Sequence, residues 1–256
     1  MDTLDAMKRR HSTRAYTGEA LTAAERATVE ALVAEAVAGE TQVSMQFAAA
    51  DGTAFDARFD KVSYYGRFKD VPACVILASP ATPEGLRATG HAGETLVLAL
   101  TGHGLDTCWA GGVIETADRT IGAESEEFDA FVEHSAEPVD VDALTDAAAR
   151  FHIAITLGHA LRPGHPHRSK PIADLLADGT DPDALPDWFA AGMEGVQLAP
   201  SALNRQNVRF APTAGPAETH TVRVTDVGGL LAKVNTGVAM LHFEQAAGVP
   251  VEFVLD

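Results

Sequence analysis

The chain has 256 residues, of which 46% are hydrophobic, and a formal net charge of -17. Its mean hydropathy of +0.01 is that of a globular protein able to bury a substantial core, as one large domain or two small ones. The acidic excess argues against a nucleic-acid partner, because phosphate backbones bind to basic surfaces. No stretch approaches 18 apolar residues and the N-terminus lacks an apolar signal core, so we expect neither membrane spanning nor export.

The first half of the chain predicts a capped helix, a set of strands and a buried helix. Thr22 and Glu25 form a capping box before apolar residues that recur on one helical face, which predicts a helix over 22–38. The apolar run at 93–105 predicts a helix that is buried on all sides. The acidic segment 115–146 predicts solvated helix and loop. Three extended runs predict strands: 43–49, 73–79 and 151–159.

The last third repeats this order of elements. Helices are predicted over 187–198 and 228–247, and strands over 207–212 and 220–226, with a final extended run in QAAGVPVEFV. Both halves therefore follow the order helix, strand, strand, central helix, final strand, and we infer an internal duplication.

Cationic side chains that could bind an anion occur in two segments. The first, KRRHSTR at 8–14, combines arginines with a serine hydroxyl, which suits a phosphate. The alternative is a short helix whose cations favour its C-terminal dipole. The second, GHALRPGHPHRSK at 158–170, adds Arg168 and Lys170. Its histidines have no cysteine or carboxylate nearby to complete a metal shell, and Cys74 and Cys108 form no CxxC, so no metal site or disulfide is predicted. Such cysteine usage favours a reducing cytoplasm.

Two further segments could approach a flat ligand. In TCWAGG, at 107–112, paired glycines after an aromatic residue allow close backbone approach, although an ordinary turn is the alternative. In LAPSALNRQNVRF, at 198–210, Asn204 can donate to and accept from a heterocycle, or the segment is a loop that ends a helix. The sequence contains no GxGxxG, GxxxxGK[ST], HExxH or GxSxG motif.

Taken together, these segments resemble the FMN-dependent nitroreductase superfamily. RHSTR at 10–14 resembles its N-terminal signature, and APSALNRQNV at 199–208 is similar to its A-P-S-x-x-N-x-Q-P-W motif, with Asn207 and Val208 in place of Pro and Trp. The segments 64–79, 104–112 and 236–248 are also similar. In two-chain members the A-P-S-x-x-N segment follows the first capped helix, but here it lies in the second half. The pattern resembles a single-chain, internally duplicated branch with one site retained.

The resemblance implies an α+β fold with a central, mainly antiparallel sheet flanked by helices, in which two halves mimic a dimer. We expect a first half over 1–160 and a second half over 161–256, together one compact domain. It also implies FMN as cofactor. Arg10, Ser12, Arg168 and Lys170 would hold the phosphate. His11 would contact the ribityl or phosphate, and Arg14 would lie near flavin N1 and the C2 carbonyl. The other implied contacts are those of the backbone near N5 and of the isoalloxazine lining: Trp109, Ala110, Gly111, Gly112, Pro200, Ser201 and Asn204.

The implied activity is ping-pong hydride transfer from NAD(P)H through flavin N5 to a nitroaromatic, quinone or activated alkene acceptor. No catalytic side chain is implied, because the flavin carries the chemistry. The alternatives are a protein of the same fold that binds FMN or another ligand without turnover, and a structural relic without a functional site. We expect a monomer that is a pseudo-dimer, with pairing into a homodimer as the alternative.

Overall fold

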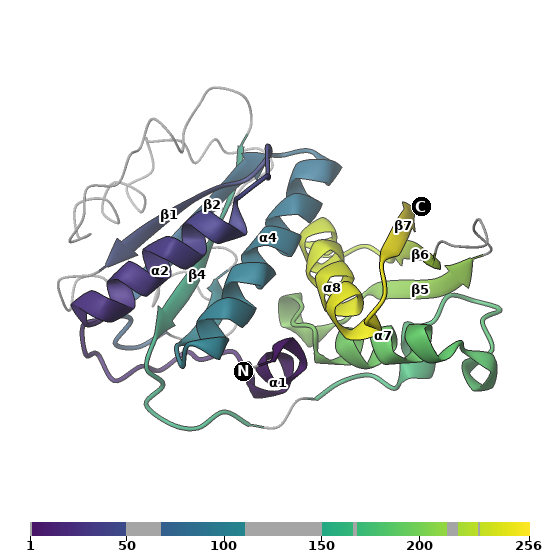
Figure 1. The fold of residues 1–256 in the computed structure, drawn as a ribbon, viewed down its shortest axis with the longest axis horizontal. Coiled ribbons are helices and arrows are strands. Elements are labelled where there is room, and N and C mark those ends of the chain that lie inside the picture. Colours follow the sequence, from purple (N-terminus) through teal and green to yellow (C-terminus); the bar gives the residue numbers. More distant parts are fainter. Residues whose placement is uncertain (1, 50–67, 111–149, 166–167, 214–219, 230) are drawn as a thin grey trace.

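The computed structural model describes residues 2–49, 68–110, 150–165, 168–213, 220–229 and 231–256. The described chain forms two units that lie side by side, each with its own sheet and helices, and we call each unit a layer. The N-terminal helix α1 (Thr3–Arg9) packs where the two layers meet (Figure 1). The predicted acidic segment 115–146 lies outside the described residues. None of the helices in the described ranges is long and apolar enough to cross a membrane.

The first layer is a four-stranded sheet with two helices on one face (Figure 1). The strand order is β1-β2-β4-β3, and every neighbouring pair is antiparallel. Helix α2 begins after Thr22, whose hydroxyl accepts from the Glu25 N–H while the Glu25 carboxylate accepts from the Thr22 N–H, so the predicted capping box is confirmed. The elements in chain order are α2 (Ala23–Ala36), β1 (Ser44–Ala49), β2 (Ala73–Pro80), α4 (Pro83–Gly102), β3 (Asp106–Ala110) and β4 (Arg150–Gly158).

The second layer repeats the order helix, strand, strand, helix, strand. Its sheet has the order β5-β6-β7, in which β5 and β6 are antiparallel and β6 and β7 are parallel. The elements are α7 (Asp187–Leu198), β5 (Val208–Thr213), β6 (His220–Asp226), α8 (Ala232–Ala247) and β7 (Val251–Leu255). Three short 3-10 turns lie between them: η1 (Ile172–Leu175), η2 (Pro182–Ala184) and η3 (Ala202–Asn204).

The predicted fold class is confirmed as α+β. The mainly antiparallel strands form two sheets, in which β6 and β7 are the parallel pair. The predicted helices and strands that lie within the described residues all occur, but α4 begins at Pro83, ten residues before the predicted start. Thr82 caps it by accepting from the Gly85 N–H, with Pro83 in the first turn. The boundary after residue 160 stays a prediction.

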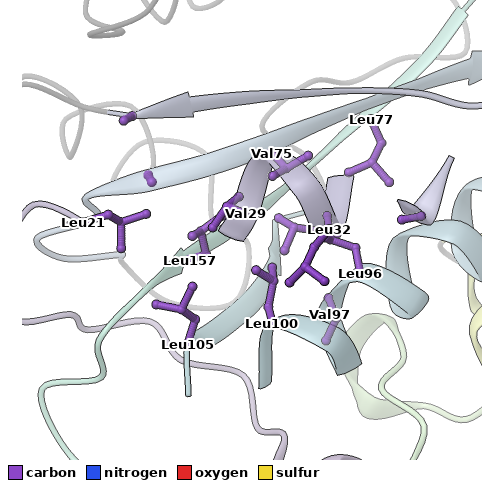
Figure 2. Close-up of a cluster of buried hydrophobic side chains, with 14 of the residues drawn as sticks. Leu21, Val29, Leu32, Val75, Leu77, Leu96, Val97, Leu100, Leu105 and Leu157 are labelled. Carbon is purple, nitrogen blue, oxygen red and sulfur yellow. The ribbon is translucent and has the colours of Figure 1, made fainter. Parts of the chain in front are cut away.

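Each layer has its own hydrophobic core. In the first, side chains of α2 and α4 meet the inward-facing residues of β2 and β4, with Val29, Val75 and Leu96 almost fully buried (Figure 2). In the second, Phe210 of β5 stacks on Phe243 of α8 with ring centroids 5.4 Å apart. A third, small cluster joins Met7 of α1 to Leu98 of α4 and Leu241 of α8. Helix α1 is therefore anchored to the central helices of both layers.

The layers are joined by the crossing of α4 and α8, which follows an internal two-fold pattern. A Cβ on Gly90 would lie 2.9 Å from the carbonyl carbon of Val234 and 3.0 Å from the Val238 nitrogen. A Cβ on Gly237 would lie 2.8 Å from the carbonyl carbon of Arg87 and 2.9 Å from the His91 nitrogen. Each glycine thus meets the residues three before and one after its counterpart. This reciprocal contact is the geometry of a two-fold interface within one chain.

Candidate functional site

The N-terminal segment that carries the predicted phosphate residues lies along the outer edge of β3. Ser12 forms a parallel bridge with Thr107, and the Thr13 N–H donates to the Thr107 carbonyl over 2.9 Å. Lys8 and Arg9 occupy the last turn of α1, as the alternative interpretation of this segment expected. Residues 11–14 continue beyond the helix. The helix therefore explains the first cations but not Ser12 and Arg14.

Arg10 is buried and faces the carboxylate of Glu94, which was not among the predicted site residues. Its Nε lies 3.8 Å from Glu94 Oε1 in α4; Arg10 is 6% exposed and Glu94 is 0% exposed. Burial lowers the pKa of Arg10, and the Glu94 charge opposes that shift. A guanidinium keeps its charge in such a setting. The predicted contact of Arg10 with a phosphate stays a prediction, and the described partner of Arg10 is Glu94.

Glu94 also binds side chains from β3 and from the second layer. The Trp109 indole N–H donates to Glu94 Oε2 over 2.7 Å, and the Trp109 ring packs against Gly93, where a Cβ would lie 2.8 Å from the indole Cζ2. His242 Nε2 of α8 lies 3.0 Å from Glu94 Oε1, and its Nδ1 lies 3.1 Å from the Gly195 carbonyl of α7. Both carboxylate oxygens are therefore engaged, and this network spans the two layers.

His11, Ser12 and Arg14 surround the edge of β3. The His11 Nε2 lies 3.0 Å from the Thr13 hydroxyl, and the His11 ring packs directly on Gly164. Ser12 is exposed. Arg14 is half-buried; its Nη1 donates to the Ser12 carbonyl over 3.4 Å, and its Nε is buried without a hydrogen-bond partner. A buried donor without a partner is uncommon in a folded protein, and a bound ligand is one way to satisfy it.

The Cys108 thiol lies among these residues. Burial raises its pKa, while the Arg14 charge, a hydrogen bond to Ser12 and the Arg10 charge act against that increase. The thiol is therefore held in its neutral form. Among the described residues no group of three or more His, Cys, Asp or Glu side chains could hold a metal ion.

The loop at 168–170 is fixed to the segment that follows α7. The Asn204 side-chain N–H donates to the Arg168 carbonyl over 2.6 Å. Gln206 is buried; its Oε1 accepts from the Lys170 N–H over 2.8 Å and its Nε2 donates to the Gln197 carbonyl over 3.1 Å. The Lys170 ammonium donates to the Gln206 carbonyl over 3.3 Å. The structure thus brings Arg168 and Lys170 together with Asn204.

This segment is tightly coiled, and its amides hold it in shape. Leu203, Asn204 and Gln206 have positive φ values of 56°, 52° and 45°, which is costly for residues other than glycine. The Gln206 N–H donates to the Ser201 hydroxyl over 2.8 Å. Pro200 and Ser201 line a cavity of about 10 Å³, the size of one water molecule. Because the Asn204 side-chain N–H donates to the Arg168 carbonyl, one side of its amide is engaged, and the predicted contact of Asn204 with a flavin stays a prediction.

The predicted site residues therefore form two groups. Arg10, His11, Ser12, Arg14, Trp109 and Ala110 surround β3, whereas Arg168, Lys170, Pro200, Ser201 and Asn204 lie at the end of α7. The loop between them touches His11 at Gly164. Gly111 and Gly112 lie outside the described residues. A cavity of about 410 Å³ between α1, α4 and α8 contains none of the predicted residues.

Three residues of these groups were missed: Glu94, His242 and Gln206. Glu94 did leave a signal, because it is the one charged residue in the predicted buried helix at 93–105. A carboxylate on a helix that is buried on all sides needs a partner. The sequence could not identify that partner, since His242 lies 148 residues away.

A family model described as "Putative TM nitroreductase" matches the sequence twice, at residues 2–132 and 129–247. The chain belongs to this nitroreductase family. The two matches agree with an internal duplication, and together they span nearly all of the chain. The curated proteins contain no match to the sequence.

The nitroreductase fold is also found in solved structures. A "putative nitroreductase" from Thermotoga maritima is 18% identical, with a TM-score of 0.58 over 96% of this chain and 83% of that one. A "putative nitroreductase in complex with FMN" from Desulfovibrio desulfuricans is 22% identical over 70% of this chain and 98% of that one, with a TM-score of 0.47. A nitroreductase with bound FMN from Desulfitobacterium hafniense is 16% identical over 68% and 96%, with a TM-score of 0.48. At 18% identity, the likeness to the Thermotoga maritima structure shows the fold alone.

Proposed function

We propose that this nitroreductase-family protein is an FMN-dependent oxidoreductase that uses NAD(P)H to reduce nitroaromatic, quinone or activated alkene acceptors. Membership of the family supports the reaction class. The observation that carries the proposal for this chain is Arg14, whose buried Nε has no partner and which lies beside the exposed Ser12 at the edge of β3. FMN offers both a phosphate and ring carbonyls as acceptors for such donors.

The types of side chain in the two groups suit the phosphate and the ring of this cofactor. Ser12, Arg168 and Lys170 would bind the phosphate, and Arg14 would donate to the N1 and C2 carbonyl edge, where a cation favours the reduced ring. Trp109 and Ala110 would border the ring from β3, and Pro200, Ser201 and Asn204 from the second layer. When bound, FMN would take hydride from NAD(P)H and pass it to the acceptor in two successive half-reactions. Because the cofactor carries this chemistry, the side chains bind and orient, and none is assigned as a general base.

The cations stand out against the charge of the whole chain. The net charge is -17, so an anionic cofactor would be repelled from most of the surface. Arg14, Arg168 and Lys170 provide local positive charge, and the Gln206 and Asn204 hydrogen bonds fix the backbone that carries two of them. We also propose that the chain acts as a monomer, because the α4–α8 crossing already supplies within one chain the two-fold contact of a dimer.

The test is the binding of FMN followed by turnover. We expect the purified chain to bind about one FMN, measured by flavin fluorescence, and then to oxidise NADH or NADPH when a quinone is added. Arg14→Ala should weaken binding by about 10-fold to 100-fold, because a hydrogen bond to a charged partner contributes roughly 1.5–3 kcal/mol.

The matched control is Arg223→Ala. Arg223 lies exposed on β6 and its removal changes the net charge by the same amount. If both variants weaken binding equally, the effect is one of overall charge and Arg14 does not contact the cofactor. Binding without NAD(P)H oxidation would favour a carrier protein, and no binding would refute the proposed function.

A further inference from the structure

Glu94 is the most deeply buried charged group in the described part of the chain, and its partners identify its role. It is 0% exposed in the middle of α4 and contacts three side chains, each from a different element. A buried carboxylate costs several kcal/mol in desolvation and persists where well-placed partners offset it. Replacing Glu94 alone would leave Arg10, the Trp109 indole N–H and the His242 ring without their shared partner. The carboxylate and its three partners therefore form one buried polar group.

One partner of Glu94, Trp109, belongs to the proposed cofactor site, and a second, Arg10, directly precedes the segment that contributes Ser12 and Arg14 to it. Trp109 is the β3 residue that precedes Ala110. Glu94 uses different oxygens for its two closest partners: Oε2 accepts from Trp109 at 2.7 Å, and Oε1 lies 3.0 Å from His242. Arg10 Nε lies 3.8 Å from the same Oε1. One carboxylate thus fixes the N-terminal segment and β3 relative to each other.

The third partner links this arrangement to the second layer. Both ring nitrogens of His242 face oxygen atoms, Nε2 towards Glu94 and Nδ1 towards the Gly195 carbonyl, so the ring is held from both sides. Gly195 belongs to α7, which leads directly into the segment at 198–206. A Cβ on Gly195 would lie 2.6 Å from the Ala246 side chain and 3.1 Å from the His242 carbonyl carbon, so α7 and α8 are in close contact here.

We propose that Glu94 is a positioning residue of the FMN site, which holds Arg10 and Trp109 in place and is itself held by His242 of the second layer. This inference rests on the proposed function. Glu94 itself contacts neither cofactor nor substrate. It aligns the N-terminal segment with β3, and through His242 this alignment depends on the second half of the chain.

The experiment compares Glu94→Gln with Glu244→Gln. Both substitutions remove one negative charge without changing size, and both remove a carboxylate that faces a histidine across α4 and α8. Glu244 Oε2 lies 2.9 Å from His91 Nε2, in a half-buried pair that includes none of the proposed site residues. FMN affinity is measured by quenching of flavin fluorescence, and stability by the thermal unfolding midpoint without FMN.

We expect Glu94→Gln to raise the FMN Kd by about tenfold or more, since the negative charge that pairs with Arg10 is removed and only a neutral amide oxygen is left to accept from the Trp109 indole N–H. Glu244→Gln should lower the unfolding midpoint but leave the FMN Kd unchanged. His242→Gln, which leaves the Glu94 charge in place but releases it from the second layer, should weaken binding in the same direction and serves if Glu94→Gln does not fold.

Three results separate the possible failures. If the wild-type chain binds no FMN, the proposed function is wrong. If the wild type binds FMN, and Glu94→Gln and Glu244→Gln show equal Kd values, only the positioning role is refuted. Tighter binding by Glu94→Gln would also overturn it, because Glu94 would then compete with the phosphate for Arg10.

Discussion

The reciprocal glycine contact between α4 and α8 predicts that Gly90→Ala destabilises the whole protein. The new methyl group would lie 2.9 Å from the Val234 carbonyl carbon and 3.0 Å from the Val238 nitrogen, and nearer still to the Val234 oxygen, whereas ordinary contacts begin at 3.4 Å. All three atoms belong to the backbone of α8, so no side chain can rotate away. The two helices must therefore move apart, and this movement disturbs the packing of the hydrophobic cores on either side of the crossing.

Two opposing terms set the size of the effect. Overpacking a tight contact costs typically 1–3 kcal/mol, and a clash with backbone places this site at the upper end, about 3 kcal/mol. Alanine in a helix interior recovers about 1 kcal/mol relative to glycine. The net loss is about 2 kcal/mol, which lowers the unfolding midpoint of a chain of this size by roughly 4–8 °C. Gly237→Ala meets the same geometry from the other helix and should cost a similar amount.

The assay is thermal unfolding by circular dichroism, with Gly102→Ala as the control. Gly102 is the last residue of α4, and a Cβ there would meet nothing within 4 Å, so its replacement should be neutral or slightly stabilising. The double variant Gly90→Ala/Gly237→Ala should lose less than the sum of the single losses, because both act on one crossing. Equal midpoints for Gly90→Ala and Gly102→Ala would refute the close contact, and with it the two-fold packing.

Two further predictions concern helix stability and pH. Thr22→Ala removes the α2 capping box and should lower the free energy of unfolding by about 1 kcal/mol. Thr28→Ala is the control, because the Thr28 hydroxyl donates to the Ala24 carbonyl of the same helix and caps nothing. Equal losses of unfolding free energy in urea for the two variants would contradict the role of the capping box. The hydrogen bond to Glu244 raises the pKa of His91 in the folded state. The pair therefore stabilises the protein below the unfolded pKa of about 6.5, and this contribution is lost as the pH rises through the higher folded value. The wild type should thus exceed Glu244→Gln in stability by more at pH 5.5 than at pH 9, and an equal difference at both would exclude the pair as the cause.

The elements of the fold could be predicted because their signals are local. Thr22 and Glu25 are three residues apart, and the branched run at 73–79 forms a buried strand whatever its neighbours are. The start of α4 was predicted wrongly because its first ten residues, apart from Pro83 and Leu86, are small or polar and show no apolar stripe. The glycines among them allow close tertiary contacts, because Gly85 lies against the Pro80 backbone and Gly90 lies against α8. Glycine in a helix predicts a weak helix by propensity, but here it marks a close approach.

The candidate site could be predicted as a set of residue types and not as an arrangement. The sequence identified Arg14, Arg168 and Lys170 as cations in an acidic chain, which is a chemical statement that needs no coordinates. It did not predict that the Asn204 side-chain N–H donates to the Arg168 carbonyl. A short polar side chain on a coiled loop has several acceptors within reach, and which of them it meets depends on a segment 36 residues away.

The two-fold packing of the backbone does not extend to the polar groups, and this asymmetry bears on the number of sites. Gly90 and Gly237 are 147 positions apart, and the same offset relates Glu94 to Leu241 and His242 to Thr95. Leu241 is buried in the apolar cluster with Met7 and Leu98, and the Thr95 hydroxyl donates to the His91 carbonyl of its own helix. One side of the crossing therefore contains a buried carboxylate that fixes two chain segments, and the equivalent position on the other side contains only hydrocarbon. Symmetry that is kept in the glycines and lost in the charges is what we expect of a duplicated chain that retained the interface and one site, and it supports the proposal of a single flavin per chain.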